Sequence, residues 1–175
     1  GGLAVLIAVF ESLKIEHMTV SDGALREGLL YDLAGRLEAQ DVRDQSVRTF
    51  AKRLSVDATQ AERVSGTVDG LAEGVAKSLG VSDRHRRYLR WAATVHECGL
   101  VVSHASYHKH GEYLVRHGNL SGFDRRAQAL LAALVRGHRR KITPEVLELS
   151  PPEDREAFPL LLALLRVSVA LHRNR

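Results

Sequence analysis

Helix start and stop signals recur from Arg43 onward and constrain the fold of this 175-residue chain more than any other feature. Asp57 and Gln60 have the spacing of a capping box, which predicts a helix beginning there and running to about residue 79. Gly80 then provides the residue type that commonly ends a helix. Because we find no convincing strand pattern in this region, we predict an all-helical domain.

Five further helices are predicted by the same reasoning. They are delimited by capping residues, by proline at the first helical position, or by a proline break before a closing apolar run. We expect one after Ser82 or Asp83 with an apolar stripe reaching Leu100, one from Ser103 through Val115, one from Asp124 to about Gly137, a start at Thr143-Pro144, and a closing helix after Ser150-Pro151-Pro152.

The N-terminal 36 residues have a different pattern. Leu3 to Leu13 is almost wholly apolar and predicts a helix buried on most sides, while KIEHMTVSDG predicts a strand and Ala24 to Leu33 a second helix. Such a unit is too small to be stable alone, so its cover is expected to lie mostly outside this chain. We place the domain boundary in the polar stretch Gly35 to Gln45, giving domains 1–36 and 37–175.

Composition limits the class of protein. With 45% hydrophobic residues and a net charge of +4, the chain can form a buried core for one domain and a fragment. It has no leader-like segment and no apolar run of about 20 residues, so we expect a soluble, cytoplasmic protein. It opens at Gly1-Gly2 and its only methionine is Met18, which suggests a piece of a longer protein. The single Cys98 excludes a disulfide framework and is expected in the core.

Histidine and basic residues concentrate in two blocks, His96 to Leu114 and Arg136 to Lys141. This composition is compatible with a metal site or with an anion site. His104 and His108 are four residues apart and would share one face of a helix. However, the zincin pattern needs a second histidine at position 100, which is leucine, and Glu97 alone supplies little anionic oxygen for a divalent ion.

The anion interpretation rests on the donors of the same two blocks. Arginine side chains match phosphate oxygens in a bidentate way. The alternative is that Arg139, Arg140 and Lys141 are simply a solvated helix end. Nucleic acid is the less favoured polyanion, because aromatic residues are only 5% of the chain and no RNA- or DNA-binding motif is present.

Three segments resemble the exopolyphosphatase and guanosine pentaphosphate phosphatase family. GGLAVLIAVFESLKIEHMTVSDGALREGLLYDL resembles the segment that closes its second actin-like lobe. RWAATVHECGLVVSHASYHKHGEYLV and GNLSGFDRRAQALLAALVRGHRRK resemble its helical C-terminal domain. The resemblance implies a fold that is mainly α, with a short α/β fragment of an actin-like lobe before a helical domain similar to HD-type metal phosphohydrolases.

The resemblance also implies an activity for the whole enzyme. Members release terminal phosphate from polyphosphate, or the 5′ phosphate from guanosine pentaphosphate, with magnesium, and their catalytic carboxylates lie upstream of the matched segments. The metal ligands of HD-type enzymes are a first histidine, a His-Asp pair and a late aspartate. In this sequence the pair reads His96-Glu97, Arg63-Val64-Ser65 stands near the position expected for the first histidine, and Val169 stands where the late aspartate would be. Since an aliphatic side chain cannot bind a metal, we expect a degenerate HD fold with neither catalytic nor metal-binding residues of its own.

We therefore predict a C-terminal portion of such a phosphohydrolase that binds polyphosphate or guanosine pentaphosphate and supports a homodimer. Two alternatives remain, an active HD-type metal-dependent phosphohydrolase and a non-catalytic dimerisation module. The residues predicted to bind substrate are Arg26, at the edge of the interlobe cleft, and a basic wall of His104, His108, Lys109, His110, His138, Arg139, Arg140 and Lys141.

Overall fold

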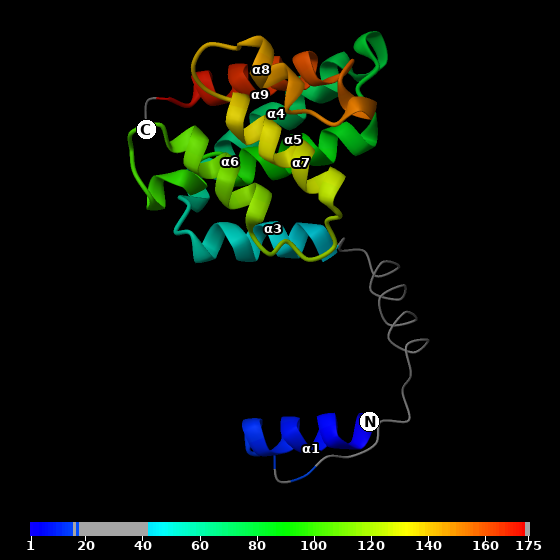
Figure 1. The fold of residues 1–175 in the computed structure, drawn as a ribbon. Helices are drawn as coiled ribbons and strands as arrows, with labels where there is room; N and C mark the ends of the chain where they lie inside the picture. Colours follow the sequence, from blue (N-terminus) through cyan, green and yellow to red (C-terminus); the bar gives the residue numbers. More distant parts are fainter. Residues whose placement is uncertain (16, 18–41, 174–175) are drawn as a thin grey trace. The chain divides into compact units, whose positions relative to one another are not determined.

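The computed structural model describes residues 1–15, 17 and 42–173 of the chain. Its residues separate into two compact units, Gly1–Ala39 and Gln40–Arg175 (Figure 1). The predicted strand at residues 14–23 lies almost wholly outside the described residues. The predicted helix Ala24 to Leu33, with Arg26, lies outside them entirely.

Helix α1, Gly2–Leu13, is the described element of the first unit. It ends where Lys14 adopts the left-handed conformation, with φ of 51°. The sequence predicts a helix here, which is confirmed, but it also predicts burial on most sides. No residue of α1 is buried, and the side chains of Leu3 and Leu13 are 71% and 68% exposed. Cover from outside the chain therefore stays a prediction.

The second unit is helical, and its described residues contain no strand. Seven α-helices and two short 3-10 helices follow one another along residues 42–171 of this described part. They are α3 Val42–Arg53, α4 Ala58–Leu79, α5 Asp83–Val95, η1 Cys98–Val101, α6 Tyr107–His117, α7 Arg125–Gly137, α8 Pro144–Glu148, η2 Pro152–Asp154 and α9 Phe158–Leu171.

Local capping signals fix most of these boundaries. The Asp57 carboxylate accepts a hydrogen bond from the Gln60 backbone N–H at 3.0 Å, and Asp124 does the same for Ala127 at 2.7 Å. The Ser82 hydroxyl caps α5. Gly80 ends α4 with φ of 69°, a conformation that glycine adopts without steric cost. The predicted starts of α4, α5 and α7 are therefore confirmed.

Two predicted boundaries are wrong. Helix α5 ends at Val95 instead of continuing to Leu100, and the chain turns into η1. The turn brings Gly99 against α6 so closely that a Cβ there would lie 2.0 Å from the Tyr107 carbonyl oxygen. Helix α6 begins at Tyr107, not Ser103, because the Ser103 hydroxyl accepts from the Ala105 N–H in a local turn and Ser106 has φ of 56°.

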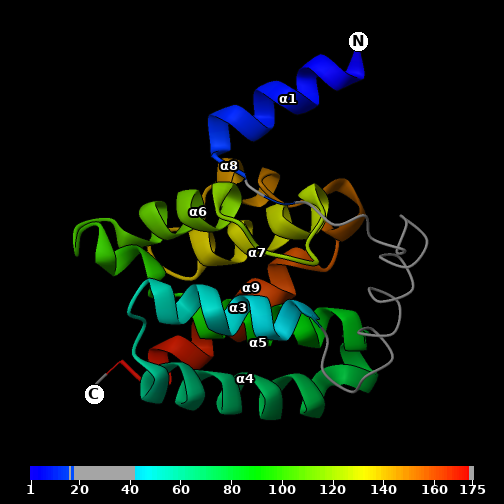
Figure 2. The ribbon, with the colours of Figure 1, turned by 90° about the horizontal axis from the view of Figure 1, so that it is seen from below.

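The core lies where α5, α7 and α9 meet. Figure 2 shows α5 and α9 between α4 on one side and α6 with α7 on the other. Helix α7 is the most deeply enclosed, since every residue from Leu130 to Val135 is buried. Phe158, Leu161 and Leu165 of α9 are fully buried as well. Complete burial of such side chains is worth about 2 kcal/mol each relative to exposure.

Cys98 belongs to this core, as the sequence predicts. Burial raises the pKa of its thiol to about 12, so the side chain is a neutral packing group at physiological pH. Among the described residues, no helix has both the length and the hydropathy of a transmembrane span.

Candidate functional site

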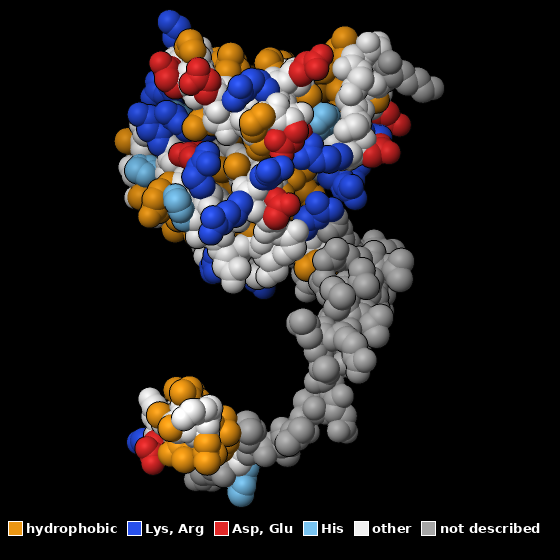
Figure 3. Space-filling view, turned by 45° about the vertical axis from the view of Figure 1, so that its right-hand side comes forward, with side chains coloured by type: hydrophobic (Ala, Val, Ile, Leu, Met, Phe, Trp, Pro, Cys, Tyr) orange, Lys and Arg blue, Asp and Glu red, His pale blue; other side chains and the backbone are white. Residues whose placement is uncertain are grey.

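A cleft of about 830 Å³ opens where η1, the start of α6, the α7–α8 connection and α9 come together. Its volume is in the range typical of ligand sites. Basic and acidic side chains are interspersed over the face of the second unit shown in Figure 3, so net surface charge alone does not identify a site. The cleft is distinguished by its lining, which consists of Glu97, Leu100, His104, Tyr107, His138, Arg139, Arg140, Arg166, Val167, Val169, Ala170 and Arg173.

Four arginines reach this cleft from two separate stretches of chain. Arg139 and Arg140 follow the end of α7, and Arg140 has a positive φ of 71°. The Arg139 guanidinium lies over the Tyr107 ring, 4.8 Å from its centroid, and this stacking restricts its orientation. Arg166, on α9, donates one hydrogen bond to the Gly137 carbonyl oxygen at 2.8 Å. A guanidinium has five N–H donors, so these contacts leave others for a ligand.

His138, at the base of the cleft, is neutral. His138 Nδ1 lies 2.6 Å from the Val135 carbonyl oxygen and is therefore assigned as the protonated nitrogen. Its Nε2 faces the Tyr107 hydroxyl at 3.4 Å, and its ring packs edge-on against His96 with centroids 5.4 Å apart. Burial, followed by the proximity of His96, lowers the pKa of His138 to about 3. His138 thus contributes shape and hydrogen bonding to the cleft, and no charge.

The structure brings together four of the nine residues predicted to bind substrate. His104, His138, Arg139 and Arg140 line the cleft. His108 lies in the interior, and burial together with the nearby arginine charges lowers its pKa to about 4. Its ring therefore forms no part of an exposed wall. Three further predicted residues are not among the cleft-lining side chains, namely Lys109, His110 and Lys141. Arg26 lies outside the described residues.

Arg166, Arg173 and Tyr107 are cleft residues that sequence reasoning missed. The two arginines are seven positions apart in the closing segment, a spacing that in a continuous helix would place side chains on one face, although α9 ends at Leu171, before Arg173. That spacing could have indicated a shared surface. The association of Arg166 and Arg173 with Arg139 and Arg140 could not be inferred from spacing, because it depends on how α9 packs against α7.

The described residues do not fit a divalent-metal centre. They contain no group of three or more His, Cys, Asp or Glu side chains that could hold a metal ion. Glu97 and Val169, which occupy two positions of the HD comparison, both line the cleft. Val169 offers no ligand atom, so it cannot supply the second anionic ligand that a two-metal site requires.

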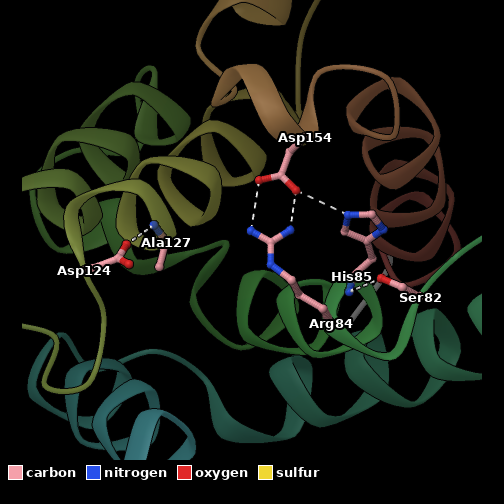
Figure 4. Close-up of polar contacts among 6 residues, drawn as sticks. All are labelled: Ser82, Arg84, His85, Asp124, Ala127 and Asp154. Carbon is pink, nitrogen blue, oxygen red and sulfur yellow. Dashed lines mark hydrogen bonds and ion pairs between the residues drawn. The ribbon is translucent and has the colours of Figure 1, made fainter.

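A second polar constellation lies away from the cleft and joins α5 to η2 (Figure 4). The carboxylate of Asp154 is almost fully buried and accepts two hydrogen bonds from the Arg84 guanidinium and one from His85 Nε2. Burial alone raises the pKa of Asp154, but the hydrogen bonds and charge of Arg84 outweigh it, and the net pKa is lowered. This is a structural clamp between two elements distant in sequence.

Comparison with known proteins supports the family resemblance. A family model described as Ppx/GppA phosphatase, domain III, matches residues 42–175. The chain belongs to the Ppx/GppA phosphatase family. A second model, described as the Ppx/GppA phosphatase family, matches residues 1–37.

Two relatives within the Ppx/GppA family are similar over nearly the whole chain. The protein of Pseudoalteromonas translucida is 35% identical over 175 residues, and that of Vibrio cholerae is 34% identical over 177 residues. Each alignment covers 99% of this chain but 35% of the relative, so the chain spans about a third of their length. Both relatives are named guanosine-5′-triphosphate,3′-diphosphate pyrophosphatase.

Proposed function

We propose that this chain is the C-terminal portion of a phosphohydrolase acting on guanosine pentaphosphate or inorganic polyphosphate, and that its cleft binds the phosphates of the substrate. The convergence of Arg139, Arg140, Arg166 and Arg173 in one cleft carries the proposal. Arginine forks match phosphate oxygens, and a shared cleft allows several forks to act on one ligand. The names of the relatives, which contain a guanosine polyphosphate, support this substrate class.

The proposed role of this region is binding without catalysis. Glu97 is the single carboxylate among the cleft-lining side chains, and the described residues hold no metal-binding cluster. Activation of water by a general base and neutralisation of phosphate charge by Mg²⁺ would therefore rest on residues upstream of this chain. As part of the same proposal, residues 1–36 belong to an actin-like lobe and residues 37–175 form an HD-like domain.

Binding of a fluorescent long-chain polyphosphate, followed by anisotropy, tests the proposal. Arg139→Gln together with Arg140→Gln is expected to weaken binding at least about tenfold, because two charge-assisted contacts are removed. The matched control is Arg125→Gln with Arg126→Gln, at the exposed start of α7 and outside the cleft lining. Equal losses in both double variants, or none in either, would show that phosphate binds elsewhere.

We also propose a homodimer, as the family resemblance implies. Light scattering measures the oligomeric state of the chain, and a polyphosphate titration measures its affinity. Together they separate a polyphosphate-binding homodimer from the simpler alternative of a dimerisation module. A dimer with cleft-dependent polyphosphate binding supports the full proposal. A dimer without polyphosphate affinity supports the module, and a monomer at all concentrations contradicts dimerisation.

A further inference from the structure

Tyr107 contacts both a buried histidine and one of the cleft arginines. The Arg139 guanidinium lies over its ring, with the guanidinium carbon 4.8 Å from the ring centroid. The same ring packs against His138, with centroids 5.4 Å apart and planes inclined by 40°. All three side chains line the cleft, and His138 is also buried. They therefore form a continuous series of contacts from the interior to the cleft.

The hydrogen bonds of His138 determine how Tyr107 is held. Because Nδ1 carries the proton that binds the Val135 carbonyl oxygen, the unprotonated Nε2 can only accept. The Tyr107 hydroxyl, 3.4 Å away, is therefore the donor. His138 is itself packed against the buried ring of His96. Burial lowers the pKa of His138 to about 3 and so keeps its acceptor nitrogen available at physiological pH.

Stacking on Tyr107 determines which part of Arg139 a ligand meets. One face of the guanidinium is covered by the ring, whereas its N–H groups lie in the plane and point outward from its edges. An edge with two parallel N–H donors is the part that binds two phosphate oxygens. A free arginine side chain loses rotamer freedom when it binds a ligand, and a guanidinium already held against a ring loses less.

We infer that Tyr107 is a positioning residue of the cleft, whose ring, oriented by His138, holds Arg139 with an edge of its guanidinium available to a phosphate group. Tyr107 acts on the anion through Arg139. The inference rests on the proposed function and goes beyond it, because phosphate binding by the arginines assigns no role to an aromatic side chain. The contact arises where the start of α6 packs against the segment that follows α7.

Isothermal titration of the 175-residue chain with inorganic tripolyphosphate tests the inference. Tyr107→Leu removes the aromatic face and is expected to weaken binding about two- to fivefold, the effect of an exposed cation–π contact. Tyr107→Phe keeps the face and is expected to restore most of the affinity. Tyr113→Leu is the matched control and should bind like the parent, because Tyr113 lies on the same helix, is 63% exposed and is outside the cleft lining.

A double-mutant cycle separates positioning from a general effect on the fold. If Tyr107 acts through Arg139, Arg139→Gln costs less affinity in the Tyr107→Leu chain than in the parent, by the factor that Tyr107→Leu itself causes. Arg140→Gln should cost the same in both chains, because the guanidinium over this ring is that of Arg139.

Nuclear magnetic resonance of the chain with isotope-labelled tyrosine gives a measurement that does not depend on the folding of Tyr107→Leu. The chain has four tyrosines, and the Tyr107 ring signal is identified by its loss in Tyr107→Phe. We expect this signal to shift when tripolyphosphate is added to the parent, and to shift much less in Arg139→Gln. An unchanged Tyr107 signal at saturating tripolyphosphate overturns the inference.

The outcomes distinguish this inference from the proposed function. If tripolyphosphate binds but Tyr107→Leu binds it like the parent, the inference is overturned and phosphate binding stands. If the losses caused by Tyr107→Leu and Arg139→Gln simply add, Tyr107 does not act through Arg139 and the inference is again overturned. If the parent chain does not bind tripolyphosphate, the proposed function fails together with the inference.

Discussion

At the scale of single residues, histidines that lie close together in the sequence differ in burial. His104 and His108 look equivalent in sequence, four residues apart, yet one is exposed and the other is enclosed. Position in a basic run therefore did not determine whether a side chain can reach a ligand. Burial makes His108 and His138 neutral, and this property predicts how stability depends on pH.

We expect the free energy of unfolding to decrease as pH falls below about 6.5. The pKa of His138 is lowered to about 3 and that of His108 to about 4, whereas both rings titrate near 6.5 when unfolded. The unfolded chain therefore binds more protons in this window. The contribution of the two neutral histidines to the free energy of unfolding is fully present above pH 6.5. It is lost as pH falls toward the folded-state pKa values, by about 1.4 kcal/mol per pH unit for each histidine.

Urea denaturation between pH 7.5 and about 4.5 measures this dependence. His138→Asn retains an N–H donor for the Val135 carbonyl oxygen. It is expected to remove about half of the pH dependence of the unfolding free energy that His108 and His138 cause together. His104→Asn is the control, because that ring is in contact with water in both states. An unchanged slope in His138→Asn would contradict the assignment.

At the scale of elements, the packing of η1 on α6 depends on Gly99. A Cβ at this position would lie 2.0 Å from the Tyr107 carbonyl oxygen and 2.5 Å from the Gly111 backbone nitrogen. Neither backbone atom can move without displacing α6. Gly99→Ala is therefore expected to destabilise the fold by about 3 kcal/mol.

Gly66→Ala, in α4, is the matched control with the opposite expected sign. A Cβ there would meet nothing within 4 Å, so alanine should stabilise the helix by about 0.5–1 kcal/mol. The midpoints of urea denaturation compare the two variants. Similar midpoints would contradict the close approach of η1 to α6.

The clamp between η2 and α5 gives a further prediction. Asp154→Asn is expected to cost about 1–3 kcal/mol, because it removes the charge that Arg84 and His85 bind in a buried position. Asp69→Asn disrupts an ion pair with Arg90 in which both side chains are partly exposed, and it should cost less than about 1 kcal/mol. Thermal melting of the two variants measures the difference, and equal losses would refute the clamp.

The sequence predicted elements well where the deciding interactions are local. Asp57, Ser82 and Asp124 each cap a helix through a backbone N–H three residues away, so a short window contains the whole interaction. The start of α6 was missed because it depends on the left-handed conformation of Ser106 and on the Gly99 contact. The grouping of the cleft arginines shows the same division, because Arg139 and Arg140 are neighbours in sequence whereas Arg166 and Arg173 join them only through folding.

At the scale of the whole molecule, phosphate binding should depend strongly on salt. Each arginine that neutralises a phosphate releases condensed counterions, as with nucleic acids. The plot of log affinity for long polyphosphate against log salt concentration should be steep. Arg140→Gln is expected to reduce its slope by about 0.7–1, while Arg126→Gln should leave it unchanged. Equal slopes for the parent chain and Arg140→Gln would remove Arg140 from the phosphate contacts.

Because Cys98 is buried, the reactivity of its thiol reports transient opening of the helical core. The sequence contains one cysteine, and its thiol is enclosed by η1 and α6 with a pKa of about 12. A thiol-reactive dye can label it only in molecules whose helical core has transiently separated. The labelling rate therefore gives the frequency of that event without any engineered probe, and a ligand that closes the neighbouring cleft should slow it.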